Sequence, residues 1–149
     1  MLAANLLVSL ILIVLTTALH FCALVFFSHR LRQKYMRHQQ KRGGAYAQAL
    51  TIIGVVLGLF FVHFAQIFIY ALAYLWIGAV EGWEPALYFS ASTFTTVGFG
   101  DLVLESDWRL LSAIESANGF LLIGWSTAFL VTVTSRIIRF AEELEEGLD

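Results

Sequence analysis

Residues 92–101 read STFTTVGFGD, and this stretch decides the fold of the chain. Within it Gly98 and Gly100 alternate with the bulky residues Val97 and Phe99. Glycine adopts positive φ without strain, so alternating glycines let successive backbone carbonyls point the same way. A row of such carbonyls can replace the hydration shell of a cation. The stretch therefore predicts a backbone whose carbonyls can line up along one side.

The residues before this stretch predict a short helix over 85–95. Pro85 is the single proline of the chain. It suits the first position of a helix, because its missing N–H would have no partner there. Glu84 adds a favourable negative charge at that helix N-terminus. Such a helix is about 16 Å long, roughly half the thickness of a bilayer. We therefore expect it to enter a membrane and stop partway.

The composition of the whole chain agrees with a membrane setting. Of its 149 residues, 59% are hydrophobic and only 13% are charged, and the mean hydropathy is +0.78. A soluble domain has about 25% charged residues. This composition excludes a disordered chain, a nucleic-acid-binding domain and a small disulfide scaffold. The single cysteine, Cys22, cannot form a disulfide within one chain.

The charged residues are gathered in blocks that leave three charge-poor stretches. These stretches are 6–27, 45–80 and 110–135, and each is long enough to cross a bilayer as a helix. We interpret 1–28 as a retained span and not as a cleaved signal peptide, because positive charges follow it instead of preceding it. The predicted fold class is an all-α membrane protein, with three transmembrane helices and a re-entrant helix before the third.

The basic block at 29–42 sets the expected orientation. It holds six Lys and Arg residues and no acid. Short loops rich in these residues stay in the cytoplasm. We therefore expect the N-terminus and segment 81–109 to lie outside and the C-terminus to lie inside, in a plasma (inner) membrane. The same block is expected to contact anionic lipid.

In this setting the sequence TTVGFGD at 95–101 resembles the selectivity filter of the potassium-channel pore family, where TVGFG is a less common variant of TVGYG. The resemblance covers roughly Tyr46–Arg139. It implies a passive, potassium-selective channel that is not an enzyme and needs no cofactor besides the permeant K⁺. Family pores use four pore loops and this chain has one, so the resemblance also implies a homotetramer.

The resemblance gives each segment a role. In chain order it implies an extra N-terminal transmembrane helix over 1–28, a basic cytoplasmic loop over 29–44, an outer helix over 45–80, a pore helix over 85–95, a filter over 96–101, an inner helix over 110–139 and an acidic cytoplasmic tail over 140–149.

The same resemblance implies which residues bind the ion. Backbone carbonyls of Thr96, Val97, Gly98 and Phe99 would bind K⁺, the Thr96 hydroxyl would add a ligand at the inner end, and Gly100 would complete the filter. The side chains of Val97 and Phe99 are expected to point away from the pore and to pack on the supporting helix.

Four residues are expected to support the filter, namely Tyr88, Ser92, Asp101 and Glu115. The Tyr88 hydroxyl is expected to donate to Asp101, a bond that braces the outer filter in relatives. Ser92 replaces a glutamate that some relatives bury behind the filter. Glu115 is the one acid within the third span, and we expect it to reach behind the filter and supply the support missing at Ser92. The alternative places Glu115 near the outer water layer.

Two glycines of the third span, Gly119 and Gly124, are candidate gating hinges. For both, close helix packing is the alternative; it is the weaker interpretation for Gly119 and the stronger one for Gly124. Gly54 and Gly58 form a GxxxG pattern that favours close approach by another helix, with the first span as the natural candidate.

Several polar residues lie within the predicted spans, and we expect them to form hydrogen bonds between helices more than a binding site. They are His20, His63 and Gln66. Asn118 and Thr127 in the third span are expected to face the cavity or a neighbouring helix, and packing is at least as strong an interpretation for each.

Two alternative functions remain open at this stage. Phe99 lacks the hydroxyl of the usual tyrosine, so a weakly selective cation channel is one alternative. The other is a non-conducting regulatory membrane subunit that has kept the motif. The sequence does not indicate a gating stimulus, because no span carries the regularly spaced arginines of a voltage sensor.

Overall fold

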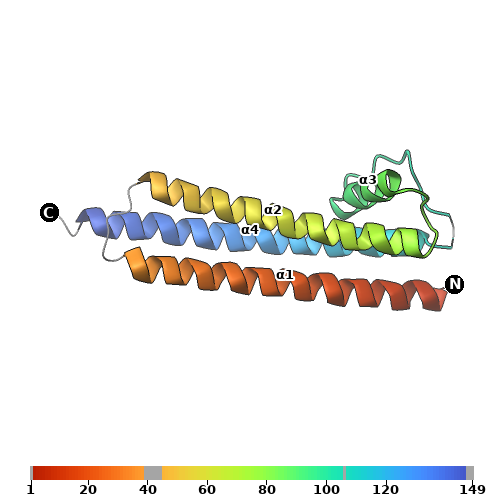
Figure 1. Cartoon of the computed structure of the whole chain (residues 1–149), viewed down its shortest axis with the longest axis horizontal. Coiled ribbons are helices and arrows are strands. Elements are labelled where there is room, and N and C mark those ends of the chain that lie inside the picture. The colour runs from red at the N-terminus through yellow and green to blue at the C-terminus, as the bar shows by residue number, and fades with distance from the viewer. Residues whose placement is uncertain (1, 39–44, 106, 147–149) are drawn as a thin grey trace.

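The computed structural model describes residues 2–38, 45–105 and 107–146, and over these residues the chain is helical without any strand. Its four helices are α1 (Leu2–His38), α2 (Ala45–Trp76), α3 (Trp83–Phe94) and α4 (Arg109–Glu146). Figure 1 shows the three long helices side by side, with the short α3 at the end where α1 begins. The predicted all-α fold is confirmed.

The three long helices are long and apolar enough to cross a membrane. The spans are Leu2–Gln33, Tyr46–Trp76 and Arg109–Arg139. Many large apolar side chains on their outer faces are exposed, Phe60 and Phe61 among them, as expected for surfaces that face lipid. The chain is therefore a multi-pass membrane protein.

Each long helix differs in extent from its prediction. Helix α1 continues through the start of the basic block to His38, ten residues beyond the predicted end at residue 28, because Arg, Lys and Gln are good helix formers and no Gly or Pro stops it earlier. Helix α2 ends at Trp76, before the predicted end at residue 80, since the chain turns at Gly78 with φ 69°. Helix α4 continues to Glu146, past the predicted boundary at residue 139.

The short helix begins earlier than predicted, so Pro85 is its third residue and not its first. The first backbone N–H of α3 that donates to a carbonyl is that of Ala86, which bonds to Gly82 at 3.2 Å. N–H groups before that point have no partner within a helix. Proline is therefore tolerated anywhere in this first turn.

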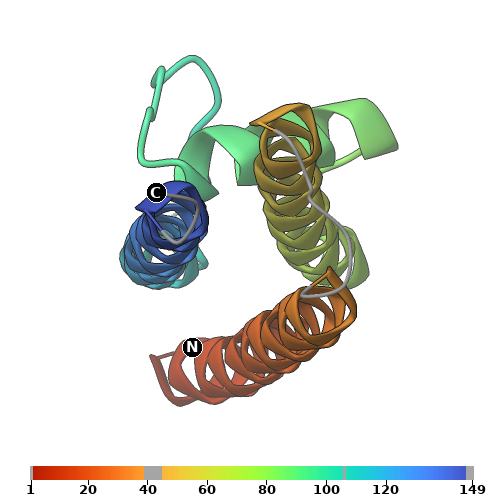
Figure 2. The ribbon, with the colours of Figure 1, turned by 90° about the vertical axis from the view of Figure 1, so that its left-hand side faces the viewer.

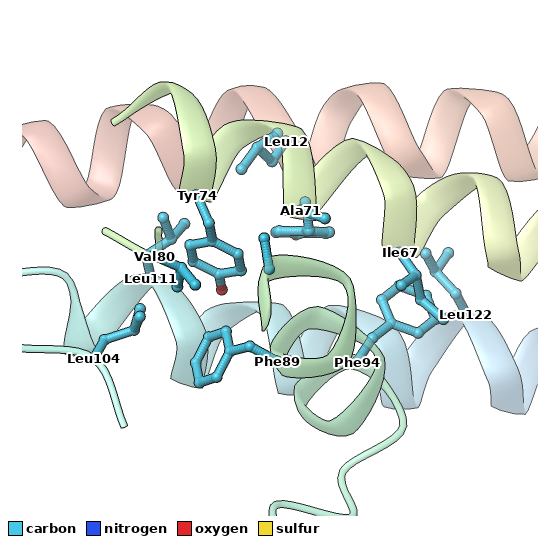
Figure 3. Packing of buried hydrophobic residues seen from close by; sticks show 12 residues of the cluster. Leu12, Ile67, Ala71, Tyr74, Val80, Phe89, Phe94, Leu104, Leu111 and Leu122 are labelled. Carbon is cyan, nitrogen blue, oxygen red and sulfur yellow. The ribbon is translucent and has the colours of Figure 1, made fainter. Parts of the chain in front are cut away.

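Helices α2, α3 and α4 enclose the main apolar core, which also takes Leu12 from α1 (Figure 3). Tyr74 and Phe94 are fully buried there. The rings of Tyr74 and Phe89 pack edge to face, with centroids 5.1 Å apart. This core fixes α3 against both of its long neighbours, and so fixes the chain that leaves its C-terminal end.

Helix α1 lies on the side of the bundle away from α3 (Figure 2). It packs on both α2 and α4, and α3 packs on the same two helices. Near the other end of the bundle, the Phe27 ring fills the space beside Gly58 where a Cβ would stand. The predicted close approach of the first span is thus confirmed at Gly58. It is wrong at Gly54, where a Cβ would meet nothing within 4 Å.

Candidate functional site

Segment 96–101, directly after α3, has an alternating backbone. Thr96, Gly98 and Gly100 have positive φ angles of 62°, 56° and 80°. This is the alternating handedness that the predicted row of carbonyls requires. We expected it at the two glycines but not at Thr96, because a threonine rarely adopts positive φ. No sequence signal marks that residue beyond its place two positions before Gly98.

The end of α3 holds this segment through Ser92. The backbone N–H of Gly98 donates to the Ser92 carbonyl at 3.1 Å. The N–H of Phe99 donates to the Ser92 hydroxyl oxygen at 3.4 Å. Two residues before Gly98, the Thr96 N–H donates to the Thr93 carbonyl at 2.9 Å. Ser92 therefore lies behind the alternating segment, where the sequence predicts a supporting residue.

Tyr88 braces the far end of the segment. Its hydroxyl donates to Asp101 Oδ2 at 2.7 Å, as predicted. This hydrogen bond raises the pKa of the Tyr88 phenol, so the hydroxyl keeps its proton and its role as donor at neutral pH. The Tyr88 ring also stacks on Phe99, with centroids 6.2 Å apart and planes 8° from parallel. Phe99 therefore contacts the supporting helix through its ring, as expected, although its side chain is 70% exposed in the single chain. The expected packing is not seen for Val97, which is 55% exposed there.

Replacing Tyr88 with phenylalanine removes this hydrogen bond and keeps the ring that stacks on Phe99. We expect openings in single-channel recordings to become several-fold shorter, because Asp101 then loses its partner on α3. Tyr46→Phe is the matched control, since Tyr46 is exposed at the start of α2, far along the chain from segment 96–101. An unchanged open time in Tyr88→Phe would refute the bracing role.

Glu115 on α4 is fully buried and joins three helices. The Tyr74 hydroxyl on α2 donates to Glu115 Oε2. The Ser90 Oγ on α3 lies 2.6 Å from Glu115 Oε1. A position near the outer water layer is therefore wrong. Glu115 does reach α3, but it contacts Ser90 and not Ser92.

The Ser90 hydroxyl has two acceptors within reach but only one hydrogen. Its Oγ lies 2.9 Å from the Ile67 carbonyl oxygen and 2.6 Å from Glu115 Oε1. Both contacts are satisfied together when the Glu115 carboxyl carries a proton and donates it to Ser90 while Ser90 donates to Ile67. The Glu115 side chain then holds α2 to α3 without a charge in the core, where an unpaired charge is costly.

Gly119 lets α4 approach the end of α3. A Cβ there would overlap the backbone carbonyl of Phe94. Three residues earlier on α4, the Ser116 hydroxyl donates to the Thr93 carbonyl at 3.0 Å. Packing thus accounts for Gly119, and α4 continues through it without a break. Gly124 has no atom within 4 Å of its Cβ position, so the close packing expected there is absent within the single chain.

Comparison with known proteins places this arrangement in a family. Residues 57–136, more than half of the chain, match the sequence profile of a family described as ion channels. The chain belongs to this ion-channel family. The match begins within α2, includes the alternating segment and ends within α4, so it leaves out α1.

This ion channel is also similar to a curated bacterial protein. The two are 38% identical over 56 residues, and the relative is an uncharacterized membrane protein, YdjJ, from Bacillus subtilis (strain 168). The match covers 37% of this chain and 16% of that protein, so the channel spans only a small part of its relative. No solved structure matches.

The helix outside the family match, α1, is joined to the channel by a closed ring of hydrogen bonds. His63 and Gln66 belong to α2, Ser126 to α4 and His20 to α1. His63 Nδ1 lies 3.0 Å from Gln66 Oε1, and His63 Nε2 lies 2.9 Å from Ser126 Oγ. His20 closes the ring, with Nδ1 3.3 Å from Gln66 Nε2 and Nε2 3.5 Å from Ser126 Oγ.

A fifth contact fixes the direction of this ring. Gln66 Nε2 donates to the Thr16 carbonyl at 3.1 Å, so the amide nitrogen faces α1 and its oxygen faces His63. His63 must then donate from Nδ1, and Ser126 donates to His63 Nε2. His20 accepts at Nδ1 and donates from Nε2 to Ser126. Every donor in the ring has one acceptor when both imidazoles are neutral.

Two further contacts extend the attachment of α1. The Asn118 amide on α4 donates to the Thr16 hydroxyl oxygen at 2.8 Å and to the Tyr70 hydroxyl oxygen at 3.1 Å. At the α3 end, Asn5 Oδ1 accepts from the Leu111 N–H at 3.2 Å. The prediction that His20, His63 and Gln66 bond between helices is confirmed. Asn118 faces neighbouring helices, which is one of its two expected positions, whereas the exposed Thr127 donates to the Ile123 carbonyl of its own helix. The role of Ser126 was not predictable, because a serine within a span gives no signal of its own.

Replacing Gln66 with leucine tests the ring. Leucine fills a similar volume but leaves the Thr16 carbonyl without its side-chain donor and both histidines without their Nδ1 partners. Interhelical hydrogen bonds in membranes contribute about 1–2 kcal/mol. We expect a lower thermal midpoint for the purified channel, whereas Gln48→Leu on the same helix should change it little. Equal midpoints for the two variants would contradict the ring.

Proposed function

We propose that this ion channel is a potassium-selective channel subunit that conducts K⁺ passively, without catalysis. The observation that carries the proposal is the alternation of positive φ at Thr96, Gly98 and Gly100 in a segment held by Ser92. In the proposed pore, carbonyls of Thr96, Val97, Gly98 and Phe99 replace the water around the ion. The sequence resemblance to potassium-channel filters supplies the identity of the ion.

The proposed pore is a homotetramer. All residues of segment 95–101 are exposed in the single chain. Irregular backbone at membrane depth is stable only where it lines a cavity or is buried in protein. One chain offers a single row of carbonyls, which cannot surround an ion. Four copies around one axis would cover the exposed side chains of Val97 and Phe99 and complete the site.

The proposed orientation places the α3 end of the bundle outside and the basic block inside a plasma (inner) membrane. The six Lys and Arg residues at 29–42 support this orientation. The first turn of α3 carries Glu84, and the filter ends at Asp101, so the outer mouth would be acidic. An acidic mouth concentrates cations at the entrance. The basic block would contact anionic lipid of the inner leaflet.

Ion flux into liposomes tests the proposal against its two alternatives. We expect the purified channel to release a K⁺ gradient and to leave a Na⁺ gradient in place. Equal rates for the two ions would indicate a weakly selective cation channel. If the correctly folded protein dissipates neither the K⁺ gradient nor the Na⁺ gradient, a non-conducting regulatory subunit is favoured.

Two glycines give a matched pair for the same assay. Gly98 and Gly78 both have positive φ, 56° and 69°, and neither has an atom within 4 Å of its Cβ position. Alanine is strained to a similar degree at each. Gly98→Ala should abolish selective flux, because it disturbs the backbone that would bind the ion, whereas Gly78→Ala should retain it. Similar flux in the two variants would argue against a conducting role for segment 96–101.

A further inference from the structure

A groove of about 1040 Å³ runs between α1 and α4 at the end of the bundle opposite to α3. The described residues that line it come from these two helices, and α1 is the helix that lies outside the family match. The groove lies beyond the ring of hydrogen bonds that joins α1 to α4 at His20 and Ser126, and Trp125 marks its deep end. It is therefore a separate feature from the proposed pore.

The mouth of the groove is strongly basic. Arg32 comes from α1, and Arg136 and Arg139 come from α4. All three lie within the last turns of their membrane spans, which end at Gln33 and Arg139. Among the described residues none of the three forms an ion pair, and the contact found for Arg139 is a donation from Nε to its own-helix Ser135 carbonyl at 3.4 Å. Three arginines thus line the groove near the membrane boundary, and no acidic residue is among the described residues that line it.

The walls of the groove are apolar toward the membrane interior. Trp125 and Phe129 of α4 line it below the arginines, and Leu31 of α1 faces them. The Trp125 side chain is 42% exposed, so part of the ring is open to the groove. A soluble anion would neutralise the arginines and leave this wall uncovered. A phospholipid with a negative headgroup matches both parts, with its phosphate at the mouth and an acyl chain along the wall.

We propose that the α1–α4 groove binds one anionic phospholipid. The guanidinium groups of Arg32, Arg136 and Arg139 hold the phosphate, and an acyl chain lies along Trp125 and Phe129. The lipid then links α1 to α4 at the end of the bundle that the ring of hydrogen bonds does not reach. This inference rests on the membrane orientation of the proposed function but not on ion selectivity. It differs from general attraction to the basic block, because two of its three arginines belong to α4.

Quenching of Trp125 fluorescence by brominated lipid tests the site in the full-length protein. The other tryptophans, Trp76, Trp83 and Trp108, are replaced by phenylalanine. We expect brominated phosphatidylglycerol, as a minor component of phosphatidylcholine vesicles, to quench Trp125 far more than brominated phosphatidylcholine at the same fraction. Each arginine near an anionic membrane surface raises the binding constant about fivefold. Replacing all three by glutamine should therefore remove the difference.

Arg30→Gln is the matched control, because Arg30 lies on the same helix but stacks over the Phe26 ring, 5.1 Å from its centroid, outside the groove. It should keep the preference for phosphatidylglycerol. Equal quenching by the two lipids, or a preference that survives the triple substitution, would overturn the proposal. So would competition by inorganic phosphate, which would identify a free anion as the occupant.

Native mass spectrometry of the protein with all its tryptophans gives a second, independent readout. Phosphatidylglycerol adducts should persist in the unmodified protein and in Arg30→Gln, and they should disappear in the triple arginine variant. Neither measurement needs a conducting pore. K⁺ flux measured on the same preparation therefore separates failure of this proposal from failure of the proposed function.

Discussion

Gly119→Ala is expected to prevent assembly of a conducting channel. The new methyl group would overlap the backbone carbonyl oxygen of Phe94, and the carbonyl carbon and Cγ of Phe94 lie within 2.9 Å of it. A backbone carbonyl cannot move aside as a flexible side chain can, so the cost is at the upper end of the usual 1–3 kcal/mol for overpacking, or about 3 kcal/mol. The alternating segment begins two residues after Phe94 at Thr96, so any shift of the end of α3 displaces it directly.

Gly124→Ala is the matched control on the same helix. Its Cβ position has no atom within 4 Å, and alanine favours a helix over glycine by about 1 kcal/mol. The yield of oligomer after purification, measured by light scattering on a sizing column, should fall sharply for Gly119→Ala and stay unchanged for Gly124→Ala. Normal assembly and K⁺ flux in Gly119→Ala would show that the close packing at Phe94 is not required.

Glu115→Leu is expected to destabilise the channel more than any other change of an acid. The substitution leaves the fully buried Tyr74 hydroxyl without its acceptor. An unsatisfied buried polar group lowers stability by about 1–3 kcal/mol. It also removes the link between α4 and Ser90 on the pore-helix side. The thermal midpoint of the assembled channel should fall, and K⁺ over Na⁺ selectivity should weaken as α3 loosens.

Glu115→Gln separates the hydrogen bonds from the charge. A glutamine can accept from Tyr74 with its oxygen and donate to Ser90 with its nitrogen, which is the pattern of a protonated carboxyl. We therefore expect a much smaller loss than for Glu115→Leu. Glu84→Gln, at an exposed position in the first turn of α3, is the control for removing an acid. A Glu115→Leu variant as stable as Glu84→Gln would refute the buried link.

The sequence predicted most of the fold because its strongest signals are local. Charge-poor stretches follow directly from the cost of charges in a bilayer, so the three spans were predictable. Pro85 and the apolar residues after it marked the short helix. The helix ends were less predictable, because the positively charged residues after residue 28 are compatible both with a loop and with the continued helix that α1 forms.

Contacts in the candidate site were predictable only where the family resemblance implied both residues of a hydrogen-bonded pair. The hydrogen bond from Tyr88 to Asp101 is of that kind. The partners of Glu115 were not, since Tyr74 lies 41 residues and Ser90 lies 25 residues from it along the chain. Nothing in a spacing pattern brings these residues together. Only the packing of three helices does so.

Glycine spacing shows the same limit. Gly54 and Gly58 share one pattern, yet Gly58 alone meets a ring from α1. Gly119 and Gly124 lie on one helix, and Gly119 alone touches the end of α3. Which glycine is needed depends on where a neighbouring helix crosses, and that crossing is set by residues far along the chain. The positive φ of Thr96 is also imposed by its surroundings and not by its own preference.

The most direct test of the central claim is the reversal potential of a single channel in a planar bilayer with K⁺ on one side and Na⁺ on the other. If segment 96–101 forms a potassium filter, the reversal potential will lie far from zero, with the sign of a K⁺-selective current, so that the K⁺ side is negative. The Gly98→Ala variant will show no such selective current. A reversal potential at zero in the unmodified channel, with a clear open current, would contradict the claim.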